Sequence, residues 1–213
     1  MARPGKKTAL LEAGRELVHG RGFSATSVSD IADAAGAPKG SFYNHFESKD
    51  DFGNAILEDY FTDVRAALTE SLQADGKPGL IRIRNYFMRL RKYVGAENFA
   101  RGCLIGNISG EVSAVSESTR ARLSGLIGEW SASLAACIKE GQRDGSVRND
   151  LPAAALASLL LDSWQGALLR AKVERRSAAL DTFIDVLLPR LAEKAGAEKA
   201  PSGKAPPGKA KGR

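Results

Sequence analysis

Cysteine and histidine are scarce in this chain, with two of each among 213 residues. Two cysteines do not make a disulfide framework, so we expect a reduced, cytoplasmic setting. A cysteine-dependent enzyme would need a histidine near Cys103, yet His19 and His45 both lie before residue 50. The sequence also lacks the clustered ligands of a metal site and a phosphate-cradling glycine motif. We therefore predict that the chain is not an enzyme and uses no metal or cofactor.

Long apolar runs are lacking as well. The longest, at residues 151–161, is interrupted and too short to span a bilayer. The first residues, "MARPGKKTALLEAGREL", contain no apolar signal region, so we expect neither export nor a membrane partner. No stretch alternates apolar and polar residues as a half-buried strand would, which predicts an all-α fold of one or two compact domains.

Positive charge is unevenly spread along the chain. The net charge is +6, of which +4 belongs to residues 196–213, where five cations face the single carboxylate of Glu198. The cations are Lys199, Lys204, Lys209, Lys211 and Arg213. This segment is rich in Gly, Pro, Ala and Lys and lacks large apolar residues, so we predict a disordered basic tail. Such a tail either solubilises the protein or adds loose attraction to DNA.

Helical spacing and capping residues divide the first part of the chain into short helices. Three are expected at residues 8–20, 26–35 and 38–46, with Thr26 or Ser27 as the cap of the second and Pro38 in the first turn of the third. Ser48 and Asp51 resemble a capping box that opens a long fourth helix. Three short helices, the last two joined by a tight turn, predict a helix-turn-helix.

The rest of the chain also has a helical pattern. Further helices are expected at residues 79–94, 103–114, 118–143, 151–175 and 177–194. We expect Asp150 to cap the penultimate helix, with Pro152 in its first turn. The last two helices are more apolar than a monomer of this size needs, which suggests that part of their surface is covered by another chain.

The third helix carries residues suited to DNA. Phe42 and Phe46 are four residues apart and are expected to pack inward, which leaves Lys39, Tyr43 and Asn44 on the other side. Lys39 can neutralise a phosphate, Asn44 can hydrogen-bond a base edge or a phosphate, and Tyr43 can contact a thymine methyl group or a phosphate.

Two neighbouring features extend this surface. Gly40 removes side-chain bulk, so the start of the third helix can approach DNA closely, and Ser41 adds a hydroxyl group. The cap at Thr26 and Ser27 is expected to direct backbone donors at a second phosphate. A small helical domain with an ordinary solvated polar face would have the same composition. Only the order of the residues can distinguish it from a DNA-binding domain.

That order resembles the TetR/AcrR family of one-component transcriptional regulators. The segments "ATSVSDIADAAG" and "KGSFYNHFESK" match the family's helix-turn-helix pattern over about residues 8–52. The resemblance implies a DNA-binding face made by Thr26, Ser27, Lys39, Gly40, Ser41, Tyr43, Asn44, His45 and Lys49. Asn44 stands where a second histidine or another aromatic is frequent, and His45 could equally serve as a capping or core histidine.

The resemblance also implies a domain plan. Residues 1–50 would form the DNA-binding domain, residues 51–195 a helical effector-sensing and dimerisation domain, and residues 196–213 the basic tail. The last two helices and their symmetry mates would form a four-helix interface in a homodimer. A two-fold dimer would bind double-stranded operator DNA with palindromic half-sites. An architectural DNA binder that uses the basic tail is the alternative, but it would not need so long an apolar second half.

Two further segments, "ARGCLIGNISGEVSAVSESTR" and "DSWQGALLRAKVERR", resemble the acrylate-responsive and electrophile-responsive repressors of this family. In electrophile-responsive members a cysteine in the "GCL" stretch reacts with the inducer and a lysine supports it. The matching residues are Cys103 and Lys172, and Arg101 is a second cation that could lower the pKa of the thiol. Modification by an electrophile or oxidant would then release the repressor from DNA.

Two alternatives for these residues stay open. Trp164 and Lys172 could line a pocket that binds a small unsaturated acid reversibly, with Lys172 paired to its carboxylate. Cys103 could also be a small apolar filler of the core, which is the role we expect for Cys137.

Overall fold

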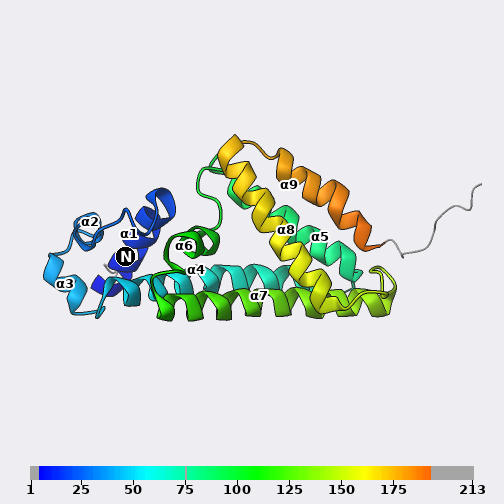
Figure 1. Cartoon of the computed structure of the whole chain (residues 1–213), viewed down its shortest axis with the longest axis horizontal. Coiled ribbons are helices and arrows are strands. Elements are labelled where there is room, and N and C mark those ends of the chain that lie inside the picture. The colour runs from blue at the N-terminus through cyan, green and yellow to red at the C-terminus, as the bar shows by residue number, and fades with distance from the viewer. Residues whose placement is uncertain (1–4, 75, 193–213) are drawn as a thin grey trace, which may run out of the picture.

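A computed structural model describes residues 5–74 and 76–192, and every regular element in these ranges is helical. Figure 1 shows one end of the molecule formed by the first three helices and the rest by longer ones. The elements are α1 (Lys6–Arg21), α2 (Val28–Ala34), α3 (Lys39–Tyr43), α4 (Lys49–Leu72), α5 (Gly79–Gly95), α6 (Leu104–Val112), α7 (Glu117–Asp144), α8 (Ala153–Glu174), α9 (Ala178–Thr182), the π-helical turn η1 (Phe183–Leu187) and the 3₁₀ turn η2 (Leu188–Leu191). The all-α prediction is confirmed; the predicted tail lies outside the described residues.

The first three helices surround an aromatic core. Phe42 and Phe46 are buried, as predicted, and both contact Phe52 of α4 with ring centroids 5.1 and 4.8 Å apart. Gly14 of α1 faces the same ring, and a Cβ at this position would lie 2.2 Å from Phe52 Cζ. Close approach at Gly14 therefore sets how α1 packs on α4.

Two long helices carry the rest of the molecule. In Figure 1, α4 and α7 run side by side, with α5, α6 and α8 packed above them and α9 on the outside of α8. Ser48 caps α4 by accepting a hydrogen bond from the Asp51 amide at 3.0 Å, as predicted. Gly79 and Gly141 allow α5 and α7 to meet, since a Cβ on Gly79 would lie 2.5 Å from the Gly141 Cα.

Three local predictions are corrected. Asp150 does not cap α8: it forms an ion pair with Arg148 at 2.6 Å, and the N-cap position is held by Pro152. The third helix ends at Tyr43 and not at Phe46, so it is a single short turn. The last helical segment is not one α-helix, because it changes to a π turn at Phe183 and to a 3₁₀ turn at Leu188, where Pro189 lacks the amide proton that an α-helix would use.

Candidate DNA-binding face and effector site

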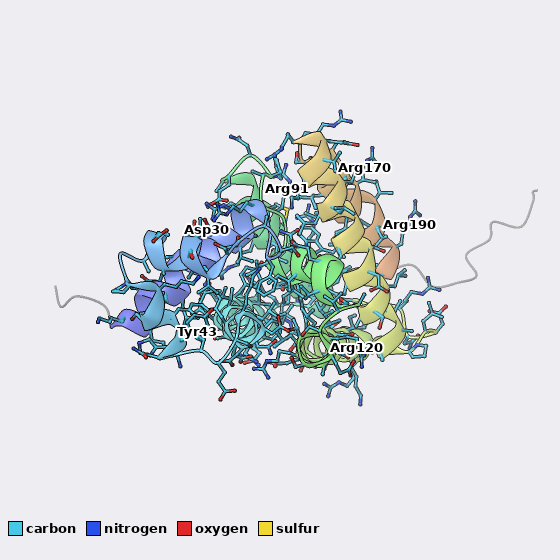
Figure 2. The ribbon with its side chains drawn as sticks, turned by 60° about the vertical axis from the view of Figure 1, so that its left-hand side comes forward. Asp30, Tyr43, Arg91, Arg120, Arg170 and Arg190 are labelled. Atoms are coloured by element: carbon cyan, nitrogen blue, oxygen red, sulfur yellow. The ribbon has the colours of Figure 1, made fainter. Side chains whose placement is uncertain are left out.

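The exposed side of α3 forms the candidate DNA-binding face. Lys39, Gly40, Tyr43, Asn44 and His45 are all exposed, and Tyr43 leaves 55% of its surface open to solvent although it is aromatic. Figure 2 shows Tyr43 at the end of the molecule far from Arg170 of α8. His45 is not a core histidine, because it is exposed and its ring centroid lies 6.5 Å from that of Phe46.

Two residues predicted for this face are not on it. Thr26 is fully buried, and its hydroxyl group donates to the Gly22 carbonyl at 2.7 Å. Ser41 is 7% exposed and lies on the inner side of α3 beside Phe42. The expectation of side-chain contacts from Thr26 and Ser41 to DNA is therefore corrected, because both are used to close the helix-turn-helix core.

The cap of α2 is closed within the protein. Ser27 is exposed, its hydroxyl accepts from the Asp30 amide at 3.1 Å, and Asp30 in turn accepts from the Ser27 amide at 2.8 Å. Hydrogen bonds from Ser27, and to a smaller extent Arg21, hold the pKa of Asp30 below its usual range. The capping box therefore uses the amides of Ser27 and Asp30, so these two donors are not free for a phosphate.

Lys49 stands at the start of α4, next to the same loop. Its ammonium group lies 4.6 Å from the centre of the Phe23 ring and 3.5 Å from the Ser24 carbonyl oxygen. The side chain is half-buried, so the cation is held in place at the edge of the α3 face.

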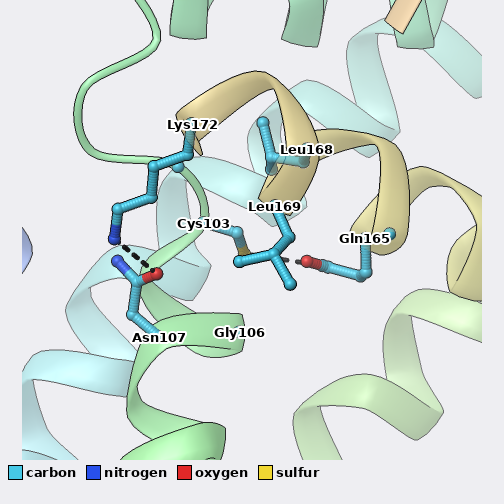
Figure 3. Close-up of a pocket in the computed structure, with 9 residues that line it drawn as sticks. Cys103, Gly106, Asn107, Gln165, Leu168, Leu169 and Lys172 are labelled. Carbon is cyan, nitrogen blue, oxygen red and sulfur yellow. Dashed lines mark hydrogen bonds between the residues drawn. The ribbon is translucent and has the colours of Figure 1, made fainter. Parts of the chain in front are cut away.

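Cys103 lies at the N-cap of α6 and is 5% exposed. It lines a cavity of about 280 Å³ between α6 and α8, together with Gly106, Asn107, Gln165, Leu169 and Lys172. The Cys103 sulfur accepts a hydrogen bond from Gln165 Nε2 at 3.5 Å (Figure 3). A small molecule in this cavity would meet the thiol directly.

Lys172 reaches the same cavity from α8. Figure 3 shows its side chain extending toward α6, where Nζ donates to Asn107 Oδ1 at 3.1 Å. Cys103 and Lys172 therefore line one cavity, although the ammonium group of Lys172 is directed at the Asn107 amide and not at the sulfur.

Arg101 and Trp164 do not take the places predicted for them. Arg101 is paired with Glu16 and Glu97, both at 2.7 Å, so its charge is already balanced by two carboxylates. Trp164 is 1% exposed and packs between Phe87 and Phe183 with centroid distances of 5.0 and 5.3 Å. It does not line the cavity at Cys103.

The loop before Cys103 has an unusual backbone. Asn98 and Phe99 have φ values of +52° and +58°, and Gly102 has +72°. Glycine adopts this left-handed region freely, whereas a residue such as Phe99 pays about 1–2 kcal/mol. Strain of this kind is often found at functional sites, and here it lies within residues 98–102, the five residues that lead to the thiol.

His19 joins this loop to the DNA-binding unit, which the sequence did not reveal. The residue is buried near the end of α1, and its Nε2 lies 3.0 Å from the Gly102 carbonyl oxygen. A histidine therefore lies beside the residue that precedes Cys103, although the sequence predicted no histidine near this thiol. The Nε2 atom, which faces this loop, is occupied by the Gly102 carbonyl and so is not available as a base for the thiol.

The buried imidazole makes folding stability depend on pH. Burial lowers the pKa of His19 below its ordinary value, and the hydrogen bond to Gly102 offsets this only in part. The folded state thus binds the proton more weakly than the unfolded state, so stability is full above about pH 6.5 and falls as the pH drops below it. We expect His19→Gln to flatten this fall between pH 7 and 5 in urea unfolding, with His45→Gln as the exposed control. An equal slope in wild type and His19→Gln would contradict the assignment.

Burial also shifts the pKa of two further groups, the Tyr60 hydroxyl beside Cys103 and the Cys137 thiol. Burial, with a further contribution from the neighbouring Cys103, raises the pKa of Tyr60 well above its usual range. Burial also raises the pKa of Cys137 to about 11, and its sulfur lies 3.7 Å from the Gly79 carbonyl oxygen. Cys137 behaves as the core filler expected from its position in the sequence.

An exposed apolar stripe follows one face of α8. Leu159, Leu169 and Val173 leave 53%, 64% and 76% of their surface open, and Val186 of η1 adds 54%. The three α8 residues recur at helical spacing, so they share one side of the helix. Exposed apolar surface of this extent on adjacent elements indicates a protein interface.

Within the part of the chain that the structure describes, no group of histidine, cysteine and acidic residues could hold a metal ion. None of the helices there has the length and apolar character needed to cross a membrane.

A helix-turn-helix with an exposed polar face, attached to a longer helical body, is the architecture of a DNA-binding transcriptional regulator. The chain belongs to the TetR family. Residues 10–56 match the model of bacterial regulatory proteins of the tetR family, and residues 79–187 match the tetracyclin repressor-like C-terminal domain. Its relatives are transcriptional repressors and not enzymes, and the chain is a TetR-type transcriptional repressor.

The relatives cover nearly the whole chain. The repressor DhaR of Mycobacterium sp. (strain GP1) is 41% identical over 90% of this chain and 94% of its own. The repressor NemR of Escherichia coli (strain K12) is 31% identical over 81% of this chain and 86% of its own. A regulatory protein TetR from Rhodobacter sphaeroides has a crystal structure that superposes with a TM-score of 0.82 at 34% identity, covering 87% of this chain and 97% of that one. The crystal structure of NemR in a reduced form gives 0.78 at 30% identity, covering 88% and 97%.

Proposed function

We propose that the protein is a cytoplasmic, dimeric repressor that is released from a palindromic operator when a small electrophile modifies Cys103. The observation that carries this proposal is the His19–Gly102 contact, because it ties the cavity at Cys103 to the helix-turn-helix. Family membership supports operator binding, since TetR repressors bind operator DNA and typically do so as dimers.

The DNA-binding part of the proposal uses the exposed side of α3. Lys39, Tyr43 and Asn44 would enter the major groove, and Ser27 and Lys49 would contact the phosphates on either side. Gly40 has no atom near its missing Cβ, so nothing on the protein prevents the start of α3 from touching the DNA backbone. His45 would contact the DNA from the end of the same turn.

The apolar stripe on α8 and η1 would form the dimer interface. We expect Leu169→Glu combined with Val173→Glu to raise the dimer dissociation constant at least ~100-fold, because burying each such side chain contributes about 1.5–3 kcal/mol. Sedimentation velocity measures the change. Val115→Glu is the matched control, since Val115 is 81% exposed but lies outside the stripe. A double variant that stays dimeric would place the interface elsewhere.

The chemistry at Cys103 needs no further reactant. The thiolate sulfur adds to the β-carbon of an α,β-unsaturated carbonyl compound, forming a C–S bond as the C=C π bond breaks. The resulting enolate takes a proton from water at its α-carbon, and the hydroxide formed is neutralised by the proton that the thiol released, so atoms and charge balance.

Three contacts would carry the change to the DNA-binding unit. His19 of α1 meets the Gly102 carbonyl, Arg101 pairs with Glu16 of α1, and the Ser24 amide donates to Glu111 of α6 at 2.7 Å. An adduct that displaces the strained loop would shift α1 and with it α3. The two α3 helices of a dimer would then no longer fit two half-sites together.

A second candidate for the same site is a reversible inducer of carboxylic acid type. Lys172 supplies a cation at the cavity, and it also lines a neighbouring cavity of about 460 Å³ that reaches Arg21 at the end of α1. A carboxylate could replace the Asn107 amide as the partner of the Lys172 ammonium group, and a ligand in the neighbouring cavity would contact the end of α1.

Operator release measured together with intact mass tests the proposal. The full-length protein is bound to the promoter region that flanks its own gene and exposed to an enone or to acrylate. Covalent sensing predicts release in step with a single adduct on Cys103. Release without a change in mass would favour the reversible acid, and no specific binding to any flanking DNA would overturn the proposed role.

A further inference from the structure

The cavity at Cys103 is bounded by two helices only. Among the described residues it is lined by α6, by the end of the loop before it and by α8, and no other helix contributes to it. Two of the lining residues on α8, Gly166 and Leu169, are exposed, and Figure 3 shows the Leu169 side chain beside Cys103. Sites for small molecules usually bury about 70–90% of the ligand surface. An occupant held by α6 and α8 alone would leave one side in solvent, so the cavity lacks a wall.

The open side of the cavity coincides with the exposed apolar stripe on α8. Leu169 belongs to the stripe and also lines the cavity. Gly166 lies midway along the same face, since it is seven residues from Leu159 and seven from Val173. No atom lies within 4 Å of the position that a Cβ on Gly166 would occupy. A helix of another protomer can therefore approach α8 most closely at this glycine.

Charged residues on this face indicate how a second copy of α8 would lie on it. Asp162 and Arg170 are both exposed and stand four residues before and four residues after Gly166. Arg170 pairs with Glu174 at 2.6 Å, but 63% of its side chain remains open to solvent. In a parallel pair of helices, Asp162 and Arg170 would each meet its own copy. In an antiparallel pair with the two-fold axis beside Gly166, Asp162 lies opposite the partner's Arg170, so opposite charges meet on both sides of the axis.

We propose that the partner protomer supplies the missing wall: the two-fold axis of the dimer passes beside Gly166, and α8 of each protomer closes the cavity at Cys103 of the other. The two cavities adjoin at the axis, because Gly166 lines each of them. This inference rests on the proposed dimer interface and deepens it by making the partner a part of the effector site. An occupant then contacts both protomers at once, which links its binding to their relative position.

Disulfide cross-linking tests the position of the axis. Facing residues of two packed helices have Cα atoms about 3.4–5.4 Å apart, since helix axes pack about 8–10 Å apart and each Cα lies about 2.3 Å from its own axis. A disulfide joins Cα atoms about 4.4–6.8 Å apart, so Gly166→Cys should link most of the protein into covalent dimers with copper phenanthroline as the oxidant. Full-length protein with Cys103→Ser and Cys137→Ala is used, so that no native thiol competes. Val115→Cys is the control, because Val115 is exposed but lies outside the stripe, and it should stay unlinked.

A second set of variants tests the direction of the partner helix without changing Gly166. An axis at this residue places Leu159 opposite the partner's Val173, so Leu159→Cys combined with Val173→Cys should also give covalent dimers. Leu159→Cys alone should not, because the two copies of residue 159 would lie about 21 Å apart along the helices. Cross-linking by Leu159→Cys alone, or by neither Gly166→Cys nor the double variant, would overturn the position of the axis.

Two thiol reagents of different size test the closure of the cavity. Methyl and benzyl methanethiosulfonate react with a thiolate by the same exchange, and access to the sulfur decides how their rates differ. Both rates are measured by intact mass in Cys137→Ala protein, where Cys103 is the remaining thiol, and each is divided by the rate of the same reagent with glutathione. Leu159→Glu combined with Val186→Glu disrupts the stripe at positions that do not line the cavity. We expect the benzyl-to-methyl ratio to rise at least ~10-fold in this variant and to stay within ~2-fold of the parent in Val115→Glu.

Sedimentation velocity and thermal unfolding, run on each variant, distinguish this inference from the proposed function. A Leu159→Glu, Val186→Glu variant that stays dimeric would show that the proposed interface is wrong, and the partner wall fails with it. A folded monomer with an unchanged ratio would show that the dimer exists but does not close the cavity. The cross-linking result decides if the variant does not fold. Neither experiment uses an inducer, so both remain decisive even if covalent sensing at Cys103 is disproved.

Discussion

Replacing Lys39 or Tyr43 by alanine is expected to weaken operator binding by about 30-fold to 20,000-fold. Each contact of this kind contributes about 1–3 kcal/mol, and a dimer loses two copies of it, so the total loss is about 2–6 kcal/mol. Both side chains are exposed, and their removal should change the free energy of unfolding by no more than about 0.5 kcal/mol. Fluorescence anisotropy with a labelled operator measures the affinity.

The two variants should differ in their response to salt. Lys39→Ala removes a phosphate contact from each protomer, so the slope of log K against log salt should fall by about 2. Tyr43→Ala should lower sequence selectivity more than the slope. Lys77→Ala is the matched control, because Lys77 is exposed and belongs to the turn between α4 and α5, and this turn follows the end of α4 that is remote from α3 (Figure 1). Tight, selective binding by both variants would show that α3 is not the reading element.

Cys103→Ser is expected to make repression insensitive to electrophiles. The variant keeps the N-cap backbone of α6 and the contact of Gly102 with His19, so operator affinity should stay within ~3-fold of wild type. A serine hydroxyl does not add to an enone at neutral pH, and release should therefore require at least ~100-fold more electrophile. Operator release at a fixed time after addition of but-3-en-2-one measures the effect.

Cys137→Ala provides the control for this experiment. Because burial raises the pKa of Cys137 to about 11, only about one molecule in 10,000 carries the thiolate at pH 7. The variant should respond to the electrophile as wild type does. An unchanged response in Cys103→Ser, or a lost response in Cys137→Ala, would remove Cys103 from its role as the sensor.

The helix-turn-helix could be predicted from the sequence because its signals are local. The cap of α2 depends on Ser27 and Asp30, which are three residues apart, and the inward turn of Phe42 and Phe46 depends on a spacing of four. The prediction that Thr26 contacts DNA was wrong because the environment of this residue is not set by local signals. Its hydroxyl is used by the carbonyl of Gly22, and whether a capping hydroxyl faces solvent or a loop is decided by the fold of the loop.

The effector site could be predicted only in part. Cys103 and Lys172 followed from the resemblance to a branch of the family, and both line one cavity. The contact between His19 and Gly102 spans 83 residues, and no periodicity or motif links positions so far apart.

The bond between His19 and Gly102 ends on a main-chain oxygen, which every amino acid possesses. Gly102 itself is constrained by its φ of +72°, but the neighbouring position 103 contributes nothing to the bond except its place in the chain. Relatives could therefore exchange the reactive side chain, or line the cavity for a different inducer, and still inherit a working mechanical link to the DNA. Because the contact uses only the main chain of the loop, repressors with this fold could change the inducer that they bind while the coupling to the helix-turn-helix stays the same.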